Sequence, residues 1–284
     1  RHRGAIGLLK EATMRDPTAT DAQELLCDIY WGALLGSSGE GQEYLLDQLV
    51  DETTSLLKLK PEDDQTYARR AVCYARKART VPSEATIKAA ENDFRKAIEI
   101  KKDNPAYWLE LIRFLSDPQI NRRNEAMQVF VEAIAAMPNN ADLRVEYAHM
   151  LNAEGRSADA MREIQAAIDN DQKNPRGYLA LAAEYQKANQ IDQALEALNR
   201  AIQVDDTDVR AYRQIAMIHT LKKQYPEALA ALRKGLSVVE EYRKNLSTTQ
   251  PAAQNSRLAL AQYELNYLLA KVLLDMQFAT SDEK

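Results

Sequence analysis

The chain has 284 residues, with 37 lysines and arginines against 42 aspartates and glutamates and a formal net charge of -5 at pH 7. This mild acidic balance, without a basic stripe or tail, argues against nucleic acid as the main partner. No apolar run approaches the roughly 18 residues of a membrane span, and nine glycines and nine prolines are few among so many helix-forming residues. Composition therefore predicts an all-α chain without a membrane span.

The first helix is predicted at the very start of the chain. Its apolar face and terminal proline are Ala5, Leu9, Ala12 and Pro17. This spacing matches the second half of the two-helix units found further along, so residues 1–19 are predicted to be a partial unit without its first helix. The chain does not begin with methionine and has no signal-peptide pattern. We therefore expect a fragment of a longer protein.

Three two-helix units of unequal length are predicted next, over residues 20–63, 64–104 and 105–140. Their apolar positions are, in chain order, Leu26, Cys27, Tyr30, Leu49, Leu56 and Leu57; Tyr67, Ala71, Tyr74, Ala90, Phe94, Ala97 and Ile98; Trp108, Leu111, Leu115, Ala126, Phe130 and Ala133. Ser83 is predicted to be the N-cap of the second helix of the middle unit. The glycine cluster Gly32, Gly36, Gly39 and Gly41 lacks the ending of a phosphate loop and predicts a flexible turn between two helices.

From Ala141 to Tyr242 one 34-residue pattern repeats three times without a gap, over residues 141–174, 175–208 and 209–242. Small residues recur at the eighth, twentieth and twenty-seventh positions, where two helices must approach closely. These residues are Ala148, Ala182 and Ala216; Ala160, Ala194 and Ala228; and Ala167, Ala201 and Gly235. A fixed period of this length indicates stacked helical hairpins.

A last helix is predicted from about Ala252 to Gln277, after a polar break. Its apolar stripe consists of Leu258, Ala261, Leu265, Leu268, Leu269, Val272 and Met276. A terminal helix that covers the open face of the last repeat is what a helical array needs for solubility, so residues 252–277 are predicted to be a capping helix. The alternative is that part of this stripe binds a partner.

The repeated residues resemble the tetratricopeptide repeat family, whose pattern has an aromatic at position four, small residues at eight, twenty and twenty-seven, and tyrosine at eleven. The resemblance covers residues 141–242 without a gap and extends upstream with insertions. The proline usual at position 32 is replaced by Gln172, Asp206 and Glu240. The resemblance implies an all-α, right-handed superhelical solenoid of stacked antiparallel helix pairs, closed by a C-terminal capping helix.

Signals for catalysis, metals or cofactors are weak. The three histidines, His2, His149 and His219, have no metal-ligand spacing with each other or with the two cysteines. Cys27 and Cys73 are interpreted as small buried hydrophobic residues rather than as a disulfide. We therefore expect neither an enzyme nor a cofactor.

In tetratricopeptide arrays the first helices line a concave groove, so the resemblance implies a set of ligand candidates. They are Arg113, Val145, His149, Asn152, Arg176, Leu179, Lys187, Arg210, Arg213 and Met217. The Lys/Asn pair of the chaperone-binding branch is absent from all five clear repeats, which disfavours a heat-shock carboxylate clamp. The three arginines at 176, 210 and 213 are predicted to cluster near Lys187 and to hold a carboxylate or phosphate. The alternative is that they pair with acidic neighbours.

The predicted function is a non-catalytic protein-protein interaction module that binds a peptide segment or partner helix in its groove, an acidic partner being one form of it. Two alternatives stay open. The chain can be a scaffolding or regulatory arm of a larger multidomain enzyme or secretion assembly, or a scaffold that self-associates as a homo-oligomer.

Overall fold

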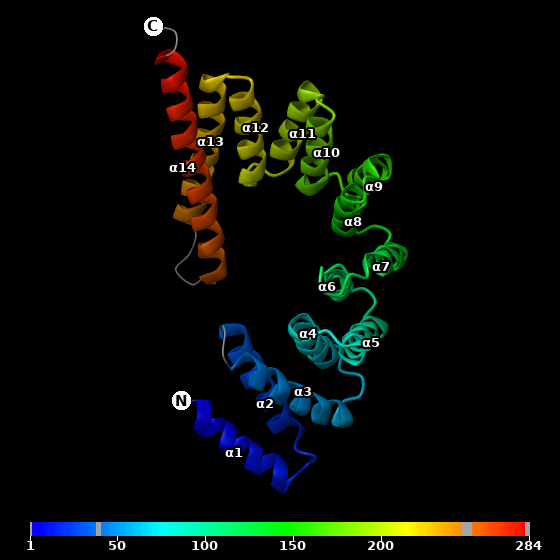
Figure 1. Ribbon diagram of the computed structural model, residues 1–284. Coiled ribbons are helices and arrows are strands. Elements are labelled where there is room, and N and C mark those ends of the chain that lie inside the picture. The colour runs from blue at the N-terminus through cyan, green and yellow to red at the C-terminus, as the bar shows by residue number, and fades with distance from the viewer. Residues whose placement is uncertain (1, 38–40, 246–251, 282–284) are drawn as a thin grey trace. The chain divides into compact units, whose positions relative to one another are not determined.

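The structure, a computed structural model, describes residues 2–37, 41–245 and 252–281, and over these residues it contains fourteen α-helices and no β-strand (Figure 1). The helices divide between two compact units, residues 1–138 and 139–284. The predicted all-α repeat fold is confirmed. Within the described ranges, no helix combines the length and the apolar character that crossing a membrane requires.

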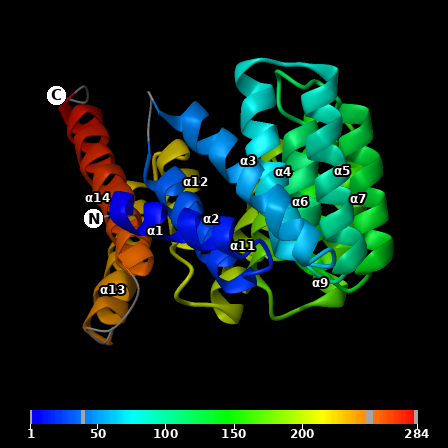
Figure 2. The ribbon, with the colours of Figure 1, turned by 90° about the horizontal axis from the view of Figure 1, so that it is seen from below.

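The first unit contains helices α1 to α7, and each helix packs on the next along the chain. Their bounds are α1 His2–Arg15, α2 Thr20–Gly36, α3 Gln42–Leu59, α4 Asp64–Thr80, α5 Glu84–Ile100, α6 Pro105–Leu115 and α7 Arg123–Ala136. Figure 2 shows α4 to α7 lying side by side. A core of large side chains, among them Tyr30, Phe94 and Phe114, lies between the helices of the first unit.

The second unit contains helices α8 to α14, of which the first six form three hairpins and the last packs on α13 (Figure 1). Their bounds are α8 Ala141–Ala153, α9 Ser157–Asn170, α10 Pro175–Lys187, α11 Ile191–Val204, α12 Val209–Leu221, α13 Tyr225–Asn245 and α14 Ala252–Ser281. The hairpins α8–α9 and α10–α11 each fall inside one 34-residue range of the sequence pattern.

Side-chain caps explain where many of the helices begin. An Asp, Ser or Asn oxygen accepts a hydrogen bond from a backbone N–H in the first turn at Asp63, Ser83, Asn104, Asn140, Asn174 and Asp208. Such a cap satisfies one of the free N–H groups at a helix start. The predicted N-cap Ser83 is confirmed, because its Oγ accepts from the Thr86 N–H at 3.2 Å.

The turns inside the three hairpins of the second unit share one geometry. Gly155, Asn189 and Lys223 have φ angles of 74°, 59° and 58°, in the left-handed region. The N–H of the following residue donates to the carbonyl oxygen five residues earlier, at Leu151, Tyr185 and His219. This is the Schellman arrangement, which ends one helix and lets the chain reverse.

Small residues lie where the helices of the second unit approach closely. The eight alanines at the eighth, twentieth and twenty-seventh positions of the three repeats are all buried. At Gly235, a Cβ atom would lie 3.2 Å from Tyr212 Cβ and 3.3 Å from Leu265 Cδ1. At Gly177 it would lie only 2.8 Å from Ile168 Cγ1. Larger side chains at these positions would force the helices apart.

The structure corrects two details of the sequence analysis. Gly32 and Gly36 lie inside α2, so the helix continues through half of the glycine cluster before it ends; Gly39 is outside the described residues. On α14, six residues of the predicted stripe pack on the core, but Met276 is exposed. The reason is length, because α14 has 30 residues and its partner α13 has 21. The last turns of α14 therefore extend beyond α13, which covers the other residues of the stripe.

Candidate functional site

The candidate surface is formed by the first helices of the hairpins in the second unit, α8, α10 and α12, together with α14. Nine of the ten predicted ligand residues lie on α8, α10 and α12. The tenth, Arg113, lies on α6 of the first unit, where its guanidinium pairs with Glu110 one turn earlier.

Two of the predicted ligand residues, Val145 and Leu179, belong mainly to the core. Val145 is 2% exposed and Leu179 is 6% exposed, so little of either side chain is available to a ligand. Met217, by contrast, is 50% exposed, and His149 is also exposed. Apolar contacts with a ligand on this surface therefore have to come from residues other than Val145 and Leu179.

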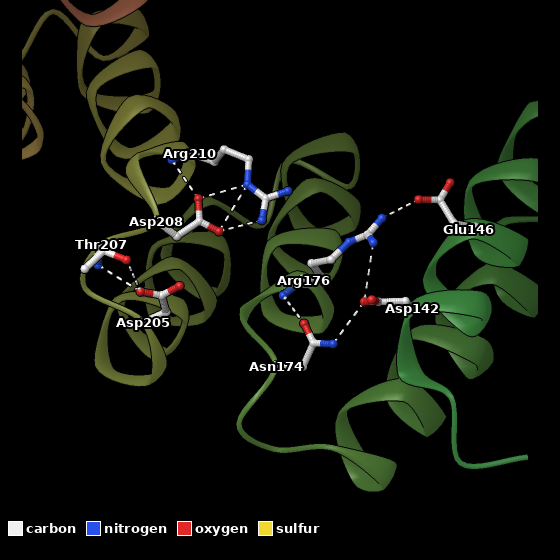
Figure 3. A network of polar contacts seen from close by, with 8 residues as sticks. All are labelled: Asp142, Glu146, Asn174, Arg176, Asp205, Thr207, Asp208 and Arg210. Atoms are coloured by element: carbon white, nitrogen blue, oxygen red, sulfur yellow. Dashed lines mark hydrogen bonds and ion pairs between the residues drawn. The ribbon is translucent and has the colours of Figure 1, made fainter. Parts of the chain in front are cut away.

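Arg176, at the start of α10, is held by two carboxylates of α8 (Figure 3). Its Nη1 lies 3.4 Å from Asp142 Oδ1, and its Nη2 pairs with Glu146. Asn174 Nδ2 donates to the same Asp142 Oδ1 at 3.0 Å. This network joins consecutive hairpins and occupies the donors of the guanidinium that would bind a ligand.

Arg210, at the start of α12, folds back onto the residue that caps its own helix (Figure 3). Its Nε donates to Asp208 Oδ1 at 2.9 Å and to Oδ2 at 3.1 Å. These hydrogen bonds raise the pKa of the Arg210 guanidinium above its usual value. Because Asp208 Oδ1 also accepts from the Arg210 N–H at 3.0 Å, cap and arginine form one closed cluster.

The remaining cations of the predicted cluster are paired as well. Arg213 forms an ion pair with Glu264 of α14, and Lys187 Nζ lies 2.7 Å from Glu184 Oε1. The alternative interpretation of the arginines therefore describes the structure: Arg176, Arg210 and Arg213 each have a carboxylate partner within their own unit. Pairs of this kind reduce the charge offered to an acidic ligand.

Asn152 is the candidate with an unused hydrogen-bonding atom. Its Nδ2 donates to Glu184 Oε1 at 2.8 Å, whereas its Oδ1 is buried and has no partner. Among the described residues, no group of three or more His, Cys, Asp or Glu side chains is placed to hold a metal ion.

An open pocket of about 520 Å³ lies on this surface, where α14 meets α10 and α12. Its lining consists of Ala183, Gln186, Arg213, Gln214, Met217, Tyr263, Glu264, Tyr267 and Leu268. Tyr263 and Tyr267 are 69% and 61% exposed. Neither tyrosine was predicted as a ligand residue from the sequence, although a signal was present: two aromatics lie four residues apart on the face of the last helix that its buried stripe does not use.

Two tetratricopeptide-repeat models match the sequence, one over residues 121–184 and the other over residues 175–208. Over residues 121–208 the chain consists of tetratricopeptide repeats. Arrays of these repeats present extended concave binding surfaces, and the chain is in this general sense a protein-interaction module. The family is typically non-catalytic.

Several solved structures are similar to this chain. Yeast Tom70 is 13% identical with a TM-score of 0.55, over 94% of this chain and 58% of that one. MamA is 21% identical with a TM-score of 0.44, over 60% and 96% of the two chains. YrrB, described as a TPR protein with an unusual peptide-binding site, is 17% identical with a TM-score of 0.44, over 72% and 96%. No curated protein matches the sequence.

Proposed function

We propose that the second unit binds a peptide segment or a partner helix on the surface of α10, α12 and α14. The observation that carries this proposal is the open pocket lined by Met217, Tyr263 and Tyr267. The apolar anchor residues of a bound peptide typically contact exposed aromatic side chains beside a concave surface. Such side chains offer a large contact area at a low cost in conformational entropy.

Charge plays the smaller part in this proposal. The Arg213–Glu264 ion pair forms one wall of the pocket and joins α12 to α14. A ligand must break that pair before either charge can bind it, so we assign affinity to the apolar contacts and orientation to the pair. The tetratricopeptide repeats support an interaction module of this kind, without identifying its partner.

The proposal is tested with peptides selected on phage against the wild-type chain. Replacing Tyr263 and Tyr267 together with alanine is expected to weaken binding of the selected peptides at least about tenfold. The control is Tyr44→Ala, which removes an equally exposed tyrosine from α3 of the first unit. Titration by fluorescence anisotropy measures both variants. Equal binding by the double variant and the wild type would contradict the proposal.

Self-association is a second candidate, which the large apolar residues exposed on α14 favour. Leu260, Leu273 and Leu274 are all exposed on this helix. Burial of such a patch between two copies would remove it from water. Light scattering over a range of concentrations tests this candidate: a mass that stays constant would exclude it, and a mass that rises and is restored to the monomer by Leu274→Asp would support it.

A further inference from the structure

The first unit has a pocket of its own that the proposed function does not use. It has a volume of about 330 Å³, and α2, α4, α5 and α6 contribute to its lining. Trp31, Val72 and Phe114 provide apolar walls, and Arg76, Arg79 and Arg113 provide positive charge. Cationic and apolar groups are therefore combined in one place.

Two of the three arginines in this pocket are neutralised. Arg79 Nε lies 2.8 Å from Asp117 Oδ2, and Arg113 pairs with Glu110. The Arg76 guanidinium forms no hydrogen bond or ion pair with any residue that the structure describes. The pocket thus carries one uncompensated positive charge, at Arg76.

Among the half-buried arginines of the described ranges, Arg76 differs from the others in having no carboxylate partner. The others all have a carboxylate partner: Arg69, Arg70, Arg122, Arg144, Arg176 and Arg213. A partly desolvated guanidinium without a partner loses hydration that no other group replaces. An anion bound in the pocket would supply the missing hydrogen bonds, in the paired geometry that a guanidinium favours.

The charge and shape of the pocket restrict the ligand. One uncompensated charge is balanced by one carboxylate, whereas a doubly charged phosphate would leave a negative excess. The apolar walls favour a hydrophobic side chain next to that carboxylate. Arg76 and Arg79 also line an adjoining pocket of about 990 Å³, so an extended ligand can contact both.

We propose that Arg76 marks a second binding site, which takes a carboxylate-bearing peptide segment with an apolar neighbouring residue. The site lies within the first unit and does not depend on the proposed peptide surface of the second.

The chain offers a specific optical readout for this site. It contains two tryptophans, and Trp31 lines the pocket. The other, Trp108, is buried, and its Nε1 donates to the Lys102 carbonyl oxygen at 2.9 Å. A ligand in the pocket is therefore expected to change the emission of Trp31, and Trp31→Phe should remove that signal.

The probe is the synthetic peptide acetyl-Gly-Ser-Leu-Glu-Leu-Ser-Gly-amide, titrated to about 1 mM, the range of weak peptide binding. We expect a saturable change in tryptophan emission with the full chain. Arg76→Ala, or glutamine in place of glutamate in the peptide, should weaken binding at least about tenfold. Arg15→Ala on α1, an exposed arginine paired with Glu11, is the matched control and should leave binding unchanged. Circular dichroism checks that each variant keeps its helices.

Several results would overturn the proposal: no saturable binding by the wild type, wild-type affinity in Arg76→Ala, or equal binding of the glutamine peptide. Competition by inorganic phosphate as strong as that of the peptide would overturn the assignment to a peptide. The variant with alanine at Tyr263 and Tyr267 should bind the probe normally. Failure of this site and failure of the second-unit surface are therefore distinguishable.

Discussion

The two units build the same kind of helical repeat from different side chains. The largest fully buried side chains of the described residues are the aromatic rings of Tyr30, Phe94 and Phe114 in the first unit, whereas the fully buried side chains of the second are aliphatic, such as Leu143, Leu198 and Leu232. The second unit relies on buried alanines where its helices meet. The first unit should therefore be sensitive to lost volume and the second to added volume.

The units also differ in how they treat their charges. In α10, Lys187 pairs with Glu184 three residues earlier. Arg76 holds the corresponding repeat position in α4, and the residue three before it is Cys73, which is buried and offers no carboxylate. Among the half-buried arginines that the structure describes, those of the second unit are all paired with carboxylates, whereas the first unit leaves Arg76 unpaired. The unit with the regular repeats is therefore not the unit that offers an unpaired half-buried arginine to a ligand.

The largest expected effect is Phe94→Ala in the first unit. The ring is fully buried, 6.1 Å from that of Phe114, so its loss should lower the free energy of unfolding by about 3–5 kcal/mol. Urea unfolding followed by tryptophan emission measures this, because both tryptophans lie in the first unit. Val131→Ala on α7, an exposed site, is the control. A loss below about 1 kcal/mol would contradict the expectation that the first unit is sensitive to lost volume.

The next effect tests the second unit with added volume. Ala194→Leu is expected to lower the free energy of unfolding by about 1–3 kcal/mol, because Ala194 is fully buried between α10 and α11. Unfolding followed by circular dichroism gives this value. Ala230→Leu on the exposed face of α13 should be almost neutral. Equal stability of both variants would show that the alanine contacts are loose.

A smaller effect is expected from the caps that both units share. Asn104 Oδ1 accepts from the Ala106 N–H at 3.1 Å, and Asn174 Oδ1 accepts from the Arg176 N–H at 3.0 Å. Replacing either asparagine with alanine should cost about 1 kcal/mol, and aspartate should restore most of it. Asn174→Ala should cost slightly more because Nδ2 also bonds Asp142. Chemical denaturation of each pair measures the difference, and no loss at either site would contradict the cap assignment.

The last prediction concerns the reactivity of the two buried thiols. Burial raises the pKa of Cys27 and of Cys73 to about 12. At pH 8 their thiolate fraction should fall about a thousandfold below that of an ordinary thiol, and labelling by Ellman's reagent should be correspondingly slow. Labelling should speed up as pH rises toward 12, and in Phe94→Ala, which opens the unit that contains both cysteines. Fast labelling of the native wild type at pH 8 would contradict the burial.

Local pattern was sufficient to predict the helices, the small residues at helix contacts and the repeat family. These features depend on residues that lie close together in the sequence, such as Ala182 and the turn that follows Lys187. They therefore recur with the 34-residue period and can be identified from it. The caps are local in the same way, as Ser83 illustrates.

The pairing of the arginines and the positions of the pockets could be determined only from the tertiary structure. Arg213 pairs with Glu264, 51 residues away, and Tyr263 and Tyr267 line a pocket only because α14 packs beside α12. Arg76 differs from the other half-buried arginines through the absence of a nearby carboxylate, which involves several helices at once. Periodicity identifies which residues face a neighbouring helix, but charge compensation depends on which neighbour is present and how it packs.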